Sequence, residues 1–199
     1  RFWEELRTVD PVELLREAAG RAAAEAGLES AVQYLARALE EPLRDEERGE
    51  LLLELAAVET NLGAGAVLAH LRDAISLLRD SDRQAEALLA LGHALYWSGE
   101  EEQGIEVLER GLAEHADLNV ELRRRLEAEF VVNATRVPSH YRRARALLAQ
   151  LDVSLDEGPG ARVLIRHELF ESRDLERTGV LDLDDVPAEV RFHRLGRYR

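Results

Sequence analysis

Three side chains that can hold a ligand lie close together near the middle of the chain. They are His93, Tyr96 and Trp97. They fall outside the stripe of Leu88, Leu91 and Leu95, whose spacing is typical of the buried side of a helix. Large, rigid side chains give contact area at a low entropic cost. We therefore predict that the three residues bind a peptide or a small effector. The alternative is that Tyr96 and Trp97 pack against a neighbouring repeat.

Candidate metal ligands occur beyond residue 160. They are His167, Glu168, Glu171, Asp182, Asp184 and Asp185. A zinc site of the metalloprotease type needs a second histidine one turn after the first, and Glu171 stands at that position. A calcium loop needs a glycine at its sixth position and a distal glutamate, a pattern that the three aspartates lack. We therefore predict no metal site.

The residue types needed for covalent or acid-base catalysis are absent or scattered. The chain has no cysteine, which excludes a disulfide, a thiolate metal site and a cysteine nucleophile. No serine or threonine stands beside a positioned base, and no pair of carboxylates falls in a recognisable frame. We expect neither an enzyme nor a cofactor.

The charge of the chain argues against nucleic acid as a direct partner. The net charge is −14, whereas nucleic-acid modules generally carry a basic face. All 26 basic residues are arginines, and two groups of them could contact phosphate: Arg123, Arg124 and Arg125, then Arg142, Arg143 and Arg145. Because Glu121, Glu127 and Glu129 share a helix with the first group, we expect ion pairs within the chain instead.

The sequence also bears on where the protein resides. No apolar run approaches the roughly 18 to 20 residues that a membrane helix needs, and the first residues lack the order of a signal peptide. We expect a cytoplasmic protein without a membrane partner. The chain does not begin with methionine, which favours a piece of a longer polypeptide with further domains.

The elements that must position these side chains are helices, joined in pairs by short turns. Asp10 and Pro11 form an N-cap and a first-turn proline, and Ser81 and Gln84 have the spacing of a capping box. The apolar spacing predicts helices over about 10–27, 31–42, 52–63, 67–78, 81–99, 104–111, 118–136 and 139–151.

The helix pairs repeat. Leu35, Leu71 and Leu108 form one column, and Ala38, Ala74 and Gly111 form another, at steps of 36 and 37 residues. A period near 34 indicates stacked helix pairs, and small residues allow close helix crossings. The third copy carries the tetratricopeptide pattern at Leu88, Leu91, Gly92, Leu95, Gly104, Leu108 and Gly111. We predict an all-α, tetratricopeptide-like right-handed superhelix of about four antiparallel helix pairs over residues 1–151.

The remainder of the chain, residues 152–199, differs from the repeats. A breaker of Asp156, Glu157, Gly158, Pro159 and Gly160 opens this part. We expect one further helix over about 161–175, then a short strand or acidic loop over 180–186. Residues 189–199 form a basic tail to which we assign no function.

Residues 10–151 resemble the helical-repeat region of the large LuxR-type ATP-binding transcriptional regulators, which are similar to the maltose-regulator class of signalling ATPases. The resemblance rests on "DPVELLREAAGRAAAEAGLESAVQYLARALEEP", "ERGELLLELAAVE" and "AHLRDAISLLRDSDRQAEALLALGHALYWSGEEEQGIEVLERGL". It implies a nucleotide-binding module before the repeats and a helix-turn-helix domain after them. It also implies a segment that receives an effector or protein partner. A stand-alone adaptor or homodimerisation scaffold, with self-association, is the alternative.

Overall fold

The computed structural model describes residues 10–63, 66–115, 117–134 and 136–150, and this part of the chain is helical without strands. The helices are α2 (Pro11–Ala24), α3 (Leu28–Ala38), α4 (Asp45–Leu62), α5 (Val67–Leu77), α6 (Ser81–Ser98), α7 (Glu101–Glu114), α8 (Val120–Ala134) and α9 (Tyr141–Gln150). The predicted all-α class is therefore confirmed. The predictions for residues 152–199, including the candidate metal ligands and the basic tail, lie outside the described residues.

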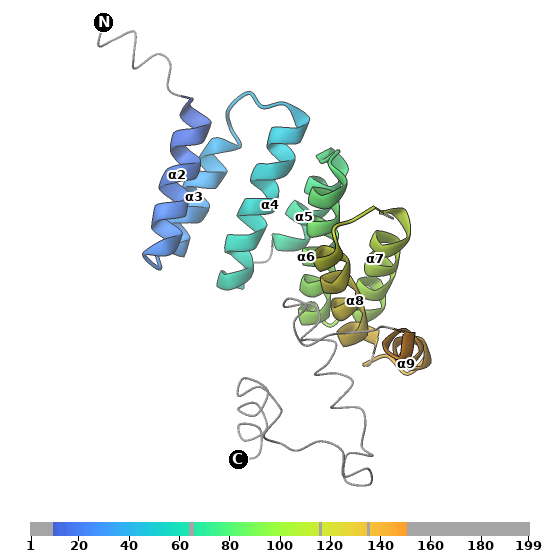
Figure 1. Ribbon diagram of the computed structural model, residues 1–199. Helices are drawn as coiled ribbons and strands as arrows, with labels where there is room; N and C mark the ends of the chain where they lie inside the picture. The colour runs from blue at the N-terminus through green and yellow to red at the C-terminus, as the bar shows by residue number, and fades with distance from the viewer. Residues whose placement is uncertain (1–9, 64–65, 116, 135, 151–199) are drawn as a thin grey trace, which may run out of the picture.

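Consecutive helices pack as pairs that follow one another along the chain (Figure 1). The pairs α2/α3, α4/α5 and α6/α7 are each in contact, and α3, α5 and α7 contact the first helix of the following pair. The first helices α6 and α8 also contact each other directly, and α8 contacts α9. The right-handed superhelical course of the stack stays a prediction.

Residues at the helix ends explain the start of α2 and the ends of α4 and α6. The Asp10 carboxylate accepts the Val12 N–H at 2.9 Å and Pro11 follows, as predicted. The longer helices α4 and α6 end at Gly63 and Gly99, whose φ angles of 66° and 82° suit glycine.

The predicted capping box at the start of α6 is wrong. The N-cap is Asp80, one residue earlier, and its carboxylate accepts the Arg83 N–H at 3.0 Å. A carboxylate is a stronger acceptor than the Ser81 hydroxyl, so the helix begins after Asp80. Gln84 instead donates its side-chain N–H to the Leu78 carbonyl at 2.5 Å. This bond ties the end of α5 to α6.

The repeated columns form the core. Leu35, Leu71 and Leu108, like Ala38 and Ala74, are no more than 2% exposed. A methyl group at Gly92 would lie 2.6 Å from Leu108 Cγ, so the Leu108 side chain occupies the space that an alanine would need there. At Gly111 the nearest atom would lie at an ordinary 3.4 Å, which explains why alanine occupies the same column elsewhere. The small residues of this column are buried, and the close helix crossings expected there stay a prediction.

None of the described helices combines the length and the apolar character that crossing a bilayer requires.

Candidate functional site

The α6 helix places the three predicted residues on its exposed side. Leu88, Leu91 and Leu95 are at most 2% exposed and face the core. On the other side, His93 is half-exposed, Tyr96 is partly buried and Trp97 is 71% exposed. The helix therefore separates the packing residues from the candidate site, as the sequence predicted.

His93 connects α6 to α8 and to Trp97 through its two ring nitrogens. Its Nδ1 lies 3.2 Å from Oε1 of Glu129 in α8, and its Nε2 lies 3.0 Å from Nε1 of Trp97. The hydrogen bond with the Glu129 carboxylate raises the pKa of His93, while partial burial acts in the opposite direction. The imidazole thus joins two helices and orients the indole.

The buried side-chain amide of Asn133 positions Glu129 from the core side. Asn133 is fully buried, and its Nδ2 donates to the Glu129 backbone carbonyl at 2.9 Å and approaches Oε1 of the carboxylate at 3.4 Å. The Oδ1 atom of the same amide has no hydrogen-bond partner and lies over Gly104, where a methyl group would come within 2.6 Å. Hydrogen bonds therefore run from the core at Asn133, through Glu129 and His93, to Trp97 at the surface.

Tyr96 supports Trp97 from the other side. The two rings meet edge to face, with centroids 5.4 Å apart and planes at 89°. The Arg136 guanidinium lies over the Tyr96 ring at 5.1 Å, donates to the Tyr96 hydroxyl at 3.3 Å and pairs with Glu101. Tyr96 thus packs against the following repeat, as the alternative interpretation proposed, whereas Trp97 remains open to solvent.

The other first helices are joined by ion pairs that sequence reasoning missed. Arg16 of α2 pairs with Glu54 of α4, and Arg83 of α6 pairs with Glu50 of α4. The partners are separated by 38 and 33 residues, which is close to the length of one repeat. An arginine and a glutamate at that separation in the sequence could therefore have predicted these ion pairs. Each pair of neighbouring first helices therefore shares a charged contact near the surface.

The α2/α4 junction is hollow where the α6/α8 junction is filled. Aligning Ala19 with Gly92 puts Gly20, Ala23 and Ala24 at the positions of His93, Tyr96 and Trp97. Of these three, Ala23 lines a cleft of about 530 Å³, together with Ala26, Leu28, Ala57, Val58 and Asn61. The Asn61 amide donates to its own helix at Ala57 O, so the cleft offers little to orient a ligand.

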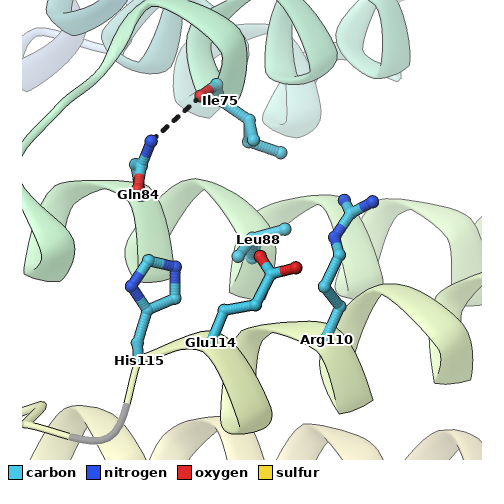
Figure 2. A pocket seen from close by; sticks show the side chains of 6 residues that line it. All are labelled: Ile75, Gln84, Leu88, Arg110, Glu114 and His115. Carbon is cyan, nitrogen blue, oxygen red and sulfur yellow. Dashed lines mark hydrogen bonds between the residues drawn. The ribbon is translucent and has the colours of Figure 1, made fainter.

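A second, smaller cleft lies where α5, α6 and α7 meet (Figure 2). Its volume is about 240 Å³, and its lining is Ile75, Gln84, Leu88, Arg110, Glu114 and His115. In Figure 2 the three side chains from the end of α7 point towards α6, and the Gln84 amide is directed at the Ile75 carbonyl. This volume is below the range of about 300–1,000 Å³ usual for ligand pockets.

The arginine clusters form ion pairs within the chain, as predicted. Arg124 pairs with Glu127 at 2.9 Å, and Arg143 pairs with Glu109 of α7 at 2.6 Å. Within the described ranges, no three histidine, aspartate or glutamate side chains are grouped to hold a metal ion. No family model, curated protein or solved structure matches this chain.

Proposed function

We propose that this chain is a protein-interaction module that binds a partner polypeptide at the exposed side of α6, centred on Trp97. The observation that carries the proposal is the combination of exposure and order at this residue. Its indole is 71% exposed, yet it is hydrogen-bonded to His93 and packed edge to face on Tyr96. A large aromatic side chain that is ordered before binding loses little entropy when a partner arrives.

The surroundings of Trp97 favour a partner segment that carries an arginine or lysine. Glu100 and Glu101 follow Trp97 closely in the sequence, Glu129 contacts its hydrogen-bond partner His93, and the whole chain has a net charge of −14. The one cation described beside the site, Arg136 over Tyr96, is itself paired with Glu101. A cation over the face of an indole is attracted by the ring as well as by these carboxylates. A small effector is less well supported, because neither cleft combines a ligand-sized volume with converging polar groups.

In the larger context, we propose that the module belongs to a LuxR-type ATP-binding transcriptional regulator. Its role there is to couple partner binding to flanking ATPase and DNA-binding domains. The resemblance of residues 10–151 supports this role, and the helix pairs provide the direct packing that coupling between domains needs. The reading frame on both sides of the segment tests it: a nucleotide-binding loop upstream and a helix-turn-helix downstream are expected.

Binding at Trp97 is tested with peptides selected from a random phage library on the full chain. We expect the selected peptides to be basic and to lose at least about tenfold in affinity for Trp97→Ala, which corresponds to about 1.4 kcal/mol. The matched control is Val120→Ala, because Val120 is 70% exposed on α8 and takes no part in the site. Equal affinities for both variants would contradict the proposal.

Self-association is a second candidate because the first helix pair also exposes large apolar side chains. Leu14 of α2 is 50% exposed and Tyr34 of α3 is 40% exposed. If these residues mediate a homodimer, sedimentation should show a concentration-dependent dimer that Leu14→Ala and Tyr34→Ala together abolish. A monomer at all concentrations would exclude the scaffold function.

A further inference from the structure

The hydrogen bonds of His93 fix the position of its proton. An indole N–H can only donate, and Trp97 Nε1 lies 3.0 Å from His93 Nε2. Nε2 must therefore accept and carries no hydrogen. The imidazole is neutral, and its single N–H is at Nδ1. There it donates to Glu129 Oε1 at 3.2 Å. His93 is thus held as the Nδ1–H tautomer by one partner on each side.

We propose that protonation of His93 releases the Trp97 indole and so makes the order of the Trp97 surface dependent on pH. A proton added at Nε2 converts the acceptor into a donor, and two N–H groups then face each other. The indole can turn away because it is 71% exposed and water can solvate it. The contact of Nδ1 with Glu129 becomes an ion pair at the same time, so the α6/α8 junction is kept.

The groups around the imidazole set the direction in which its pKa is shifted. Within the described part of the chain, Glu129 of α8 is the charged group that contacts His93. Arg136 and Glu101 lie beyond Tyr96 and pair with each other. Neither α4 nor α7 contributes a described hydrogen bond or ion pair to the ring. The Glu129 contact raises the pKa of His93 above 6.5, whereas burial and the indole N–H favour the neutral ring.

Protonation of His93 should also change the affinity for a partner, and this consequence rests on the proposed function. When His93 is neutral, Trp97 is already ordered, and a partner does not have to fix it. When His93 is protonated, the ordering has to occur on binding, and the added positive charge repels a basic segment. The partner is therefore expected to bind more weakly as the pH falls through the pKa of His93.

The test is an NMR titration of the full chain carrying Trp3→Phe, which leaves Trp97 as its one indole. At high pH the imidazole nitrogen shifts should report the Nδ1–H tautomer, and the Trp97 Nε1–H should be shifted downfield and protected from exchange. On acidification, the indole and imidazole signals should change with the same midpoint. An Nε2–H tautomer, or an indole signal that does not follow His93, would overturn the proposal.

Two conservative variants separate the effect of His93 protonation from the effect of its packing and hydrogen bonds. In His93→Gln the amide can still donate to Glu129 and accept from the indole but does not titrate, so the indole signal should stay constant with pH. In Glu129→Gln the hydrogen bond is kept without its charge, so the common midpoint should move to lower pH. A pH-dependent indole in His93→Gln would contradict the proposal.

The titration needs no partner, so it separates this proposal from the proposed function. If the indole titrates with His93 but no selected peptide depends on Trp97, the protein-interaction function fails and the proton dependence stands. If peptides depend on Trp97 while the indole is insensitive to pH, the proton dependence fails and the interaction function stands.

Discussion

The α2/α4 and α6/α8 junctions have similar cores and opposite surfaces. Ala19 and Ala56, which align with Gly92, are nearly fully buried, and each junction carries a contact between a glutamate and a basic side chain of neighbouring first helices. At the surface, however, the first junction leaves an alanine-lined cleft of about 530 Å³. The second is filled by His93, Tyr96 and Trp97, with Arg136 beyond them.

The difference shows that one repeating backbone can carry unrelated surfaces. Packing requires the buried columns to recur, because helices that cross closely tolerate only small side chains there. The exposed positions are not constrained in this way and can diverge from one repeat to the next. The proposed partner site is therefore assigned to side chains that depart from the repeat.

The largest loss of stability is expected from substitutions in the buried part of the α6/α8 junction. Gly104→Ala would place a methyl group 2.6 Å from Asn133 Oδ1 and 3.2 Å from the Gly92 carbonyl, so we expect a loss of about 2 kcal/mol. Asn133→Ala loses the bond to the Glu129 carbonyl and should cost about 1.5 kcal/mol. The double variant should lose less than the sum, because the methyl group added at position 104 occupies the space of the removed amide. Urea unfolding measures all three.

The control for these single and double variants is Gly111→Ala. Its methyl group would make an ordinary contact at 3.4 Å, and alanine favours a helix over glycine by up to about 1 kcal/mol. The variant should therefore be neutral or stabilised. Strict additivity of Gly104→Ala and Asn133→Ala would show that the amide does not fill the space over Gly104.

Sequence reasoning found the part of this arrangement that recurs along the chain. Gly92, Gly104 and the leucine columns were identifiable because packing repeats at a nearly constant period. His93 and Trp97 were identifiable because they interrupt the polar side of a well-marked helix.

The partners of these residues were missed for a physical reason. Glu129 and Arg136 lie 36 and 40 residues beyond His93 and Tyr96, in a fourth pair whose pattern departs from the consensus. The register of that pair is set by the three-dimensional contact of α8 with α6, which a degenerate pattern does not encode. The α2/α4 cleft was missed because it is a property of small side chains that leave space.

A moderate effect is expected from emptying the filled surface. Tyr96→Ala removes the edge-to-face contact with Trp97 and the ring beneath the Arg136 guanidinium, and should cost about 1 kcal/mol. The aligned control is Thr60→Ala in α4. The Thr60 hydroxyl donates to Ala56 O in its own helix, so we expect a change below about 0.5 kcal/mol. Equal losses in thermal or urea unfolding would show that Tyr96 contributes no more than the residue at the aligned position of the preceding repeat.

A smaller effect of opposite sign is expected from filling the cleft. Ala23→Leu places an apolar side chain in the space between α2 and α4 and should stabilise the chain by about 0.5 kcal/mol. Ala24→Leu is the matched control, because Ala24 is exposed and outside the cleft lining, and it should bring no gain. If both variants gave the same free energy of unfolding, the cleft would not accept a side chain in solution.

The smallest effect distinguishes the two junctions by their response to pH. The contact with Glu129 raises the folded-state pKa of His93 above its ordinary value of 6.5. The stability that this pair contributes is therefore fully present below the ordinary pKa, and it is lost as the pH rises through the folded-state pKa. The Arg16 guanidinium stays charged over the same range, so its pair with Glu54 should not vary. The stability difference between the wild-type chain and His93→Gln should therefore be larger near about pH 6 than near about pH 8.5, by a few tenths of a kcal/mol, since the pair is partly exposed. The same difference for Arg16→Gln should be constant, and a parallel pH dependence in both variants would show that the two contacts respond to a common change elsewhere in the chain.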